Sequence, residues 1–485
     1  MMYVFLWLYM VVPALATSPI TVAICIIAEK ILSSASSVYY PGQQQYDKDI
    51  NHWTISAAQN SVCSVEPGRI EDVSLLIKLL GLTRTPFAVK SGGHTANLGF
   101  SSTPGVQISL SRFRDISYNA KDKTATFGAG LVWDDVYAAL APYNVSLNGA
   151  RVPGIGVGGF TLGGGYSYRT NQFGLAIDTV VSYKLVKPNG DIVSVTQASD
   201  PELFFGLKGG FNNFGIVTQF TLRAFPQGAV WGGVITYSSA NVNQVLNALA
   251  TFSAKATDPK AALVSNTLSV PGQFQIIVTL FYDAPSAPKG IFDDFLAIPS
   301  LSTDLSTRSM LSLIKAGGGF DGLRATSHVT PNAFYTPAML NAIWNQTLYW
   351  GAHLPAAANP IVTYAIEPFL PSAFTRATSD SAYLSAKSRA QHLNPTGMVF
   401  AYTADPAQAA KYEPIFKAAI RESAAFLTQA AERSGQPSDA VVYPNYAIFD
   451  TPLTDIYGDN LPRLVKLKKR VDPFNVMGLA GGWKI

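Results

Sequence analysis

Cysteine is the scarcest informative residue of this chain, with only Cys25 and Cys63 among 485 residues. Two cysteines outside a Cys-x-x-Cys arrangement cannot by themselves build a metal site. They are either two inert buried thiols or one disulfide, and a disulfide requires an oxidising compartment. Histidine is also rare, with five residues and no spacing typical of metal ligands. The sequence therefore predicts no metal site.

Charged residues make up only 14% of the chain, and the net charge is +4. That charge is too dilute for a nucleic-acid-binding surface, and the basic run from Lys466 to Arg470 is typical of a solvated helix face. Hydrophobic residues make up 48% of the chain, which argues against disorder and indicates a large buried volume. A chain of 485 residues exceeds what one hydrophobic core usually organises, so we expect two domains.

The N-terminus lacks charge: Met1 to Ala16 is an apolar run that ends in small residues. The run predicts a secretory signal peptide at residues 1–17, although no Lys or Arg precedes it. A membrane anchor is the alternative, but Pro13 and Pro19 interrupt the run, which is shorter than the ~20 apolar residues of a spanning helix. We therefore expect no stable membrane anchor and a protein that is secreted or enters the secretory pathway.

Glycine, in contrast, is abundant, and its clusters organise the N-terminal half of the chain. In Pro86 to Thr95 a short apolar strand leads into a Gly-Gly turn that ends at His94. Paired glycines allow positive φ and bring backbone N–H groups close to a ligand, as in a nest that binds pyrophosphate. A lone histidine is usually structural, but a histidine in this context favours contact with a flavin.

The second cluster is Arg151 to Tyr166, in which seven of sixteen residues are glycine. A flexible linker would not place large apolar residues such as Phe160 among its glycines. The pattern therefore predicts a loop wrapped against a large flat ligand with an anionic tail. A third segment, Lys208 to Phe220, joins a glycine-rich turn to a strand that begins Gly-Ile-Val-Thr.

Other local patterns predict the surrounding elements. We expect a strand, a turn and a loop across residues 34–57, and a helix that starts at Pro67. Further predictions are strands at Thr124–Gly128 and Val180–Val186 and helices at Pro201–Leu207 and Glu413–Glu432.

The three glycine segments, in this order, resemble those of FAD-linked oxidoreductases of the berberine-bridge-enzyme-like group, within the vanillyl-alcohol-oxidase superfamily, and its fungal members in particular. The C-terminal segments Tyr443 to Tyr446 and Asp472 to Val476 also match that group. The resemblance implies an α+β, two-domain PCMH-type FAD-binding fold. Its expected parts are a signal peptide (1–17), an FAD-binding domain (18–228), a substrate domain with an antiparallel sheet (229–440) and a C-terminal segment that returns to the FAD-binding domain (441–485).

The resemblance implies FAD bound through one covalent bond, from His94 to the 8α carbon of the flavin. A cysteine makes a second bond in part of the group, but Val152 stands at that position here. The residues assigned to the cofactor besides His94 are Lys90, Ser91, Gly92, Gly93, Thr95, Gly154, Ile155, Gly158, Gly159, Gly163, Gly164, Gly165, Gly215, Ile216, Val217 and Asn475.

The same resemblance pairs Cys25 with Cys63, and closing a loop of that size would stabilise the fold by ~3–4 kcal/mol. A disulfide agrees with secretion, as do the Asn-x-Ser/Thr triplets at Asn144 and Asn345, which fit a glycoprotein.

Tyr446 stands where members of the group carry a catalytic tyrosine, and Tyr443 is its neighbour. A phenol with a pKa near ~10 is a poor base at neutral pH. Its pKa would have to be lowered by a cation or by the flavin itself. Among 22 tyrosines, a packing role is the alternative for both.

The resemblance implies an FAD-dependent oxidoreductase that takes hydride from an alcohol or amine carbon of a small molecule. Its expected electron acceptor is O2, which would yield H2O2. Because Ile155 stands where side-chain bulk gates oxygen in the group, another acceptor is the alternative. The apolar composition favours a substrate from secondary metabolism. A carbohydrate substrate, or a pocket in which the flavin mainly directs a cyclisation, are the alternatives.

Overall fold

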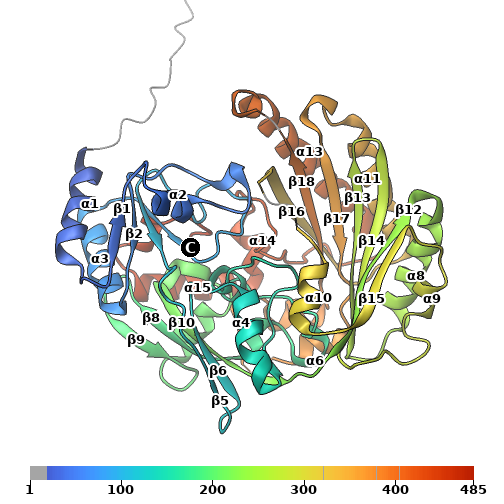
Figure 1. Ribbon diagram of the computed structural model, residues 1–485, viewed down its shortest axis with the longest axis horizontal. Helices are drawn as coiled ribbons and strands as arrows, with labels where there is room; N and C mark the ends of the chain where they lie inside the picture. The colour runs from blue at the N-terminus through green and yellow to red at the C-terminus, as the bar shows by residue number, and fades with distance from the viewer. Residues whose placement is uncertain (1–18, 320–321, 378, 404) are drawn as a thin grey trace, which may run out of the picture.

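The computed structural model describes residues 19–319, 322–377, 379–403 and 405–485. The predicted signal peptide therefore lies outside the described residues. Figure 1 shows the chain as two halves side by side, with the N-terminal elements in one half and the largest sheet in the other.

The first half contains a four-stranded sheet in the order β1-β2-β4-β3, in which β2, β4 and β3 run parallel. Helix α1 carries Cys25, which forms a disulfide with Cys63 at the start of β2, as predicted. The bounds are α1 Pro19–Ile31, β1 Ser37–Tyr39, α2 Gln44–Ile50, β2 Cys63–Glu66, α3 Ile70–Thr83, β3 Phe87–Lys90 and β4 Val106–Ser109.

A five-stranded antiparallel sheet, β5-β6-β10-β8-β9, completes the first half. Its strands are β5 Ile116–Asn119, β6 Thr124–Gly128, β8 Val180–Val186, β9 Ile192–Val195 and β10 Ile216–Arg223, and the small pair is β7 Val145–Ser146 with β11 Phe225–Pro226. The helices among them are α4 Trp133–Leu140, α5 Val157–Leu162, α6 Thr170–Phe173 and α7 Pro201–Leu207.

The second half is built on a seven-stranded antiparallel sheet in the order β15-β12-β14-β13-β17-β18-β16. Its strands are β12 Val230–Ser238, β13 Ala261–Val270, β14 Gln273–Tyr282, β15 Ser302–Arg308, β16 Arg324–Asn332, β17 Ile361–Ile366 and β18 Asn394–Tyr402. The helices are α8 Val242–Lys255, α9 Asp293–Leu296, α10 Met310–Ala316, α11 Pro337–His353, α12 Ala386–Ala390 and α13 Pro406–Arg433.

Alternation along these strands sends side chains to opposite faces of the large sheet. One face, with Tyr364 and Phe400, packs against α8, α11 and α13 in a hydrophobic core of its own. The other face turns toward the first half, where Phe281 and Val329 join a second core. The face with Tyr364 and Phe400 is therefore covered by helices, and only the face with Phe281 and Val329 can contact the glycine segments.

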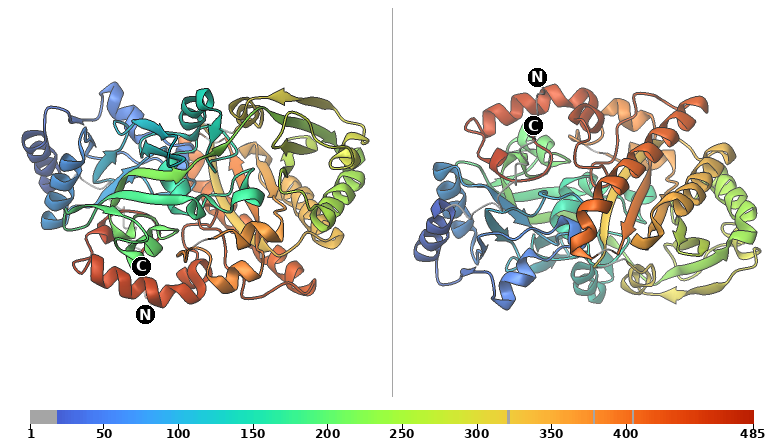
Figure 2. Two further views of the ribbon diagram at one scale, coloured as in Figure 1. Left: turned by 90° about the horizontal axis from the view of Figure 1, so that it is seen from below. Right: turned by 90° about the horizontal axis from the view of Figure 1, so that it is seen from above.

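The C-terminal segment, with α14 Leu453–Tyr457 and α15 Leu461–Val471, packs on the first half (Figure 2). The Tyr457 hydroxyl donates to the Gly209 carbonyl over 3.4 Å, and the Arg463 guanidinium pairs with Glu202 at 2.6 Å. Short 3₁₀ helices connect the elements at Ile55–Ala57, Ala141–Tyr143, Ala176–Asp178, Phe211–Phe214, Ser239–Asn241, Ala356–Ala358, Pro371–Thr375, Gly458–Asn460 and Met477–Leu479.

Three local predictions were wrong. Residues 34–57 contain helix α2 where a loop was expected, and the helix expected from Pro67 begins at Ile70. The glycine segment expected to be a loop contains helix α5, because Leu162 and Val157 are buried and tertiary packing outweighs the low helix propensity of glycine. The elements predicted at 124–128, 180–186 and 201–207 are confirmed with the same bounds.

Among the described helices, none combines the length and apolarity needed to cross a bilayer. Within the same residues, no group of three or more His, Cys, Asp or Glu side chains could hold a metal ion.

Candidate active site

The three glycine segments predicted from the sequence meet in the first half of the fold. The Ser91 hydroxyl donates to the Ala129 carbonyl over 2.6 Å and accepts from the backbone N–H of Gly158 over 3.2 Å. Ala129 in turn donates its N–H to the carbonyl of Thr218 in β10, over 2.9 Å. One serine hydroxyl and one backbone hydrogen bond thus join segments that are far apart in the chain.

Close backbone contact explains the glycines at this junction. A Cβ at Gly92 would lie 2.6 Å from the Cα of Gly156, a distance that no real Cβ tolerates. At Gly154 and Gly159, in contrast, an added Cβ would meet no atom within 4 Å, and both residues are exposed. The segment therefore packs tightly at Gly156 and faces open space at Gly154 and Gly159.

His94 follows this junction and is partly buried. The indole of Trp53 stacks on its imidazole, with ring centroids 4.4 Å apart and planes inclined by 10°. Burial lowers the pKa of His94 to about 4, because a low-dielectric environment disfavours the charged imidazolium. The ring is therefore neutral at physiological pH, which is the form that can act as a nucleophile.

Two neighbours of His94 support the turn through contacts with the protein itself. The Lys90 ammonium donates to the carbonyls of Lys48 and Asp49 at the end of α2, over 3.0 and 2.9 Å. The carbonyl of Thr95 accepts from the Thr54 hydroxyl over 3.2 Å. These two predicted cofactor residues therefore hold the turn against the loop that follows α2.

A buried polar cluster lies between the two halves and contains Tyr446. The Arg151 guanidinium forms an ion pair with Glu367, with Nη2 to Oε2 at 2.6 Å and side chains only 8% and 2% exposed. The same Nη2 donates to the Tyr446 hydroxyl oxygen over 3.0 Å, and Tyr446 donates to Glu367 Oε1 over 3.1 Å. Each of the three groups contacts the other two, so the tyrosine hydroxyl is fixed between a cation and a carboxylate.

Burial is the largest influence on the pKa values of Tyr446 and Glu367. The pKa of Tyr446 lies well above 10, because burial and the Glu367 charge both raise it and Arg151 only partly offsets them. Burial also raises the pKa of Glu367, against the opposing effect of Arg151. The cation expected beside Tyr446 is thus present, but it does not make the phenol a strong base by itself.

Tyr443 has a different environment from its neighbour. Its hydroxyl oxygen accepts from the Gly165 N–H over 3.2 Å and from the Asn445 amide over 2.8 Å. Burial raises its pKa to about 12. Its ring packs edge-on against Tyr446, with centroids 4.8 Å apart. Tyr443 therefore packs beside the cluster of Arg151, Glu367 and Tyr446 without a hydrogen bond from its hydroxyl to those three residues.

The remaining predicted cofactor residues fall into three environments. Cβ atoms at Gly163, Gly164 and Gly165 would strike Asn445, Tyr383 and Phe160 or Ala176, so these glycines allow close packing. In the second environment, Gly215 packs against Val186, and Ile216 and Val217 are buried in β10. In the third, Gly93 lies against Lys90 and Ile155 is half-buried.

Asn475 lies apart from these groups. Asn475 is exposed, and its carbonyl oxygen lies 3.5 Å from Arg84 Nη1. Arg84 precedes strand β3, whereas His94 follows the opposite end of that strand. No contact among the described residues brings Asn475 to the glycine junction.

Three residues of the site were not predicted: Arg151, Glu367 and Trp53. Arg151 stands at the head of the glycine segment, where a buried arginine could have been sought from its position alone. Glu367 and Trp53 belong to no motif, and only tertiary contacts reveal them.

The residues present fit FAD. A neutral imidazole, open space beside Gly154 and Gly159, and a buried Arg151 Nη1 without a partner among the described residues all lie on the segments that meet at Ser91. This arrangement of glycine junction, neutral imidazole and buried tyrosine is compatible with a flavin-dependent oxidoreductase.

Comparisons with known proteins agree with this class. Residues 62–196 match the "FAD binding domain" family, and residues 442–480 match the "Berberine and berberine like" family. The FAD-dependent monooxygenase yanF of Aspergillus niger is 31% identical over 477 residues, which cover 96% of this chain and 80% of yanF. The FAD-dependent monooxygenase drtC of Aspergillus calidoustus is 36% identical over 59% of this chain, and the match spans 55% of drtC.

Solved structures share the fold at low identity. The wild-type BBE-like 1 protein of Physcomitrella patens superposes with a TM-score of 0.74 at 18% identity, covering 94% of this chain and 97% of that one. The glucooligosaccharide oxidase of Acremonium strictum, described with a 6-S-cysteinyl, 8α-N1-histidyl FAD, gives a TM-score of 0.74 at 15% identity, covering 94% and 97%. The chain belongs to the berberine-bridge-enzyme-like family of FAD-linked oxidoreductases and is an FAD-dependent enzyme with the PCMH-type fold.

Proposed function

We propose that this oxidoreductase removes a hydride from a carbon that bears a hydroxyl or an amine, with Tyr446 and Glu367 taking the accompanying proton. Bound FAD supplies the two-electron acceptor for this chemistry. The observation that carries the proposal is the buried cluster of Arg151, Glu367 and Tyr446, with its donor and acceptor distances of 2.6–3.1 Å.

The high pKa of Tyr446 suggests how the proton moves. A free tyrosinate is scarce at neutral pH, but the Tyr446 hydroxyl already donates to Glu367 Oε1. As Tyr446 Oη accepts the proton of the substrate, it passes its own proton to the carboxylate. Arg151, bonded to both partners, holds them in line and stabilises negative charge on either oxygen.

We assign His94 to a single covalent bond with the FAD. Its neutral imidazole and its place after the Gly-Gly turn support the assignment, and Val152 leaves no cysteine for a second bond. The predicted cofactor residues on the glycine segments complete the proposed site, and Tyr443 is a supporting residue. In this proposal, the FAD-binding domain is residues 18–228, the substrate domain 229–440 and the returning segment 441–485.

The inner face of the large sheet supports an apolar substrate. Gly397 marks this face, because a Cβ there would lie 3.0 Å from the Tyr446 ring. The cross-strand neighbours beside it are Asn266, Ala365 and Val329, and the next row is Leu268, Thr363, Val399 and Ser327. Four of these seven side chains are apolar and none is charged or aromatic, so the rows suit a largely apolar skeleton, while Asn266, Thr363 and Ser327 can hydrogen-bond a hydroxyl or an amine on it.

A metabolite alcohol or amine is therefore the proposed substrate class, and an oligosaccharide is the second candidate. We propose O2 as the electron acceptor, with another acceptor as the alternative. Secretion is part of the proposal and is supported by the Cys25–Cys63 disulfide, since disulfides persist in oxidising compartments. A flavin that only shapes a cyclisation pocket is the remaining alternative.

The experiment is anaerobic mixing of the purified yellow protein with panels of apolar alcohols, amines and oligosaccharides. Bleaching of the flavin by an apolar alcohol or amine supports the proposal, whereas bleaching by oligosaccharides alone would assign a carbohydrate oxidase. Tyr446→Phe should slow bleaching by roughly 10²–10⁴-fold, the usual contribution of a general base. Tyr143→Phe, at an exposed tyrosine, is the matched control and should leave the rate unchanged.

A further inference from the structure

The loop after α2 contacts the His94 turn on one side and the large sheet on the other. The Trp53 N–H donates to the Gly93 carbonyl over 3.1 Å, one residue before His94, while the Trp53 indole covers the His94 ring. Two residues further on, the Ile55 N–H donates to the Leu323 carbonyl over 2.9 Å. We name residues 53–56 the strap.

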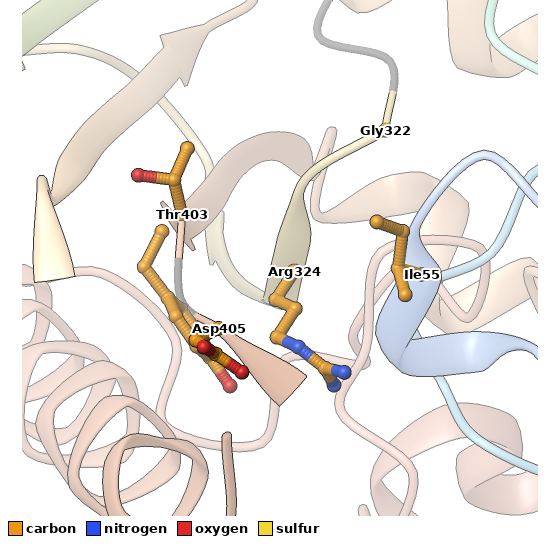
Figure 3. Close-up of a pocket in the computed structure, with 6 residues that line it drawn as sticks. Ile55, Gly322, Arg324, Thr403 and Asp405 are labelled. Carbon is orange, nitrogen blue, oxygen red and sulfur yellow. The ribbon is translucent and has the colours of Figure 1, made fainter. Parts of the chain in front are cut away.

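Ser56 fixes the far end of the strap to β16, the edge strand of the seven-stranded sheet. Its hydroxyl donates to the Ala325 carbonyl over 2.9 Å and accepts from the Ala325 N–H over 3.0 Å. Figure 3 shows Ile55 of the strap facing Arg324 across a pocket of about 320 Å³ at the start of this strand. The strap therefore joins the histidine turn to the substrate-side sheet by named bonds at both ends.

The near end of the strap is equally constrained. His52, directly before Trp53, is buried, and its ring nitrogens contact the Ile50 carbonyl at 2.7 Å and the Ser101 hydroxyl at 2.9 Å. Lys90 binds the carbonyls at the end of α2 from the other side. With both ends of the loop held, the Trp53 indole has little freedom to leave the imidazole.

We propose that Trp53 is a positioning residue for flavin attachment, fixing the orientation of the His94 imidazole in which its nitrogen attacks the 8α carbon. This inference rests on the proposed covalent role of His94. An imidazole on a glycine turn can rotate about two side-chain bonds, and a parallel stack at 4.4 Å removes most of that freedom. Trp53 also shields one ring face from water and so helps keep the imidazole neutral.

Attachment of FAD to His94 is a two-electron oxidation. A bond forms between an imidazole nitrogen and the 8α carbon, the imidazole loses its N–H proton, and the methyl group loses one hydrogen. The two electrons pass to the flavin ring, and O2 then removes them with two protons as H2O2. Trp53 takes no part in the electron transfer and acts only on the orientation of the imidazole.

The test compares the rate of covalent FAD incorporation in cofactor-free protein after FAD is added. The covalent fraction is measured by acid precipitation and intact mass, and reversible FAD binding by fluorescence. Trp53→Ala should slow attachment about tenfold, the upper range for loss of one aromatic stack, and should change reversible binding by less than about threefold. Trp53→Phe, which restores a stacking ring, should recover most of the rate.

Trp231→Ala is the matched control, because Trp231 is also half-buried and stacks on one aromatic ring, that of Phe292, in the other half. It should attach FAD at the wild-type rate. If Trp53→Ala attaches FAD at the wild-type rate, or if Trp53→Phe is as slow as Trp53→Ala, the inference fails while the covalent role of His94 stands. If the wild-type protein releases all its FAD on precipitation, the covalent assignment and the inference fail together.

If Trp53→Ala does not fold, Trp53→Phe and Trp53→His decide the question, since both rings preserve volume better. Equal attachment rates for wild type, Phe and His support a stacking role. A rate that falls in both variants while reversible FAD binding is retained means that the indole is needed for something other than stacking, and overturns the inference.

Discussion

Replacing Glu367 by glutamine tests the buried cluster most sharply. The change keeps an oxygen that can accept from Tyr446 but removes the negative charge opposite Arg151, whose side chain is only 8% exposed. Breaking a buried ion pair by removing one partner costs about 3–5 kcal/mol, because the other charge remains uncompensated. We expect a loss of this size in the free energy of unfolding, measured by denaturant titration.

The same variant should lose the final acceptor of the proton. An amide cannot take the proton that Tyr446 passes on, so anaerobic flavin reduction should slow by roughly 10²–10⁴-fold, the range for loss of a general base. A double variant, Arg151→Gln with Glu367→Gln, should regain much of the lost stability because no buried charge remains unpaired. It should not regain the reduction rate.

Glu413→Gln is the matched control, because Glu413 pairs with Lys417 on the surface of α13 with both side chains about one-third exposed. Exposed pairs of this kind contribute only about 0–1 kcal/mol, so neither stability nor reduction rate should change much. A Glu367→Gln protein that reduces its flavin within threefold of the wild-type rate would refute the assignment of Glu367 as proton acceptor.

Three further predictions follow from the geometry. Gly92→Ala should strongly destabilise the cofactor-free protein, because the new Cβ would lie 2.6 Å from the Gly156 Cα. Gly159→Ala should not, because a Cβ at that residue meets open space, and thermal unfolding compares the two variants. Cys25→Ser should lower the free energy of unfolding by about 3–4 kcal/mol, and reducing agent should affect only the wild type. The free energy of unfolding of the cofactor-free protein should decrease as the pH is lowered from 6.5 to 4, because in that range only the unfolded chain protonates His94. His94→Gln should remove up to about 3 kcal/mol of that decrease, measured by denaturant titration at each pH.

Features of the site that depend on local chemistry could be predicted from the sequence. Gly92 in the turn before His94 and Gly156 in the second glycine segment are required by close backbone approach, and such a requirement is visible in the sequence as glycine. The strand at Val180–Val186 and the helix at Pro201–Leu207 follow from local pattern, and the structure gives them the same bounds.

Features that depend on partners distant in the chain could not be predicted from the sequence. Arg151 and Glu367 are 216 residues apart, and no sequence motif around either residue predicts that they form an ion pair. The bonds from the Lys90 ammonium to the end of α2 depend on a helix that the sequence pattern did not indicate. Trp53 stands in a loop, so only the stack at 4.4 Å shows its relation to His94.

The most direct test of the account is the flavin content of the wild-type protein and of His94→Ala after acid precipitation, measured by visible spectrum and intact mass. We expect a yellow wild-type pellet whose polypeptide carries one FAD, and a His94→Ala protein that binds FAD but releases it to the supernatant. Wild-type protein that leaves a colourless pellet would contradict the bond to His94, and purified protein that takes up no flavin at all would contradict the site as a whole.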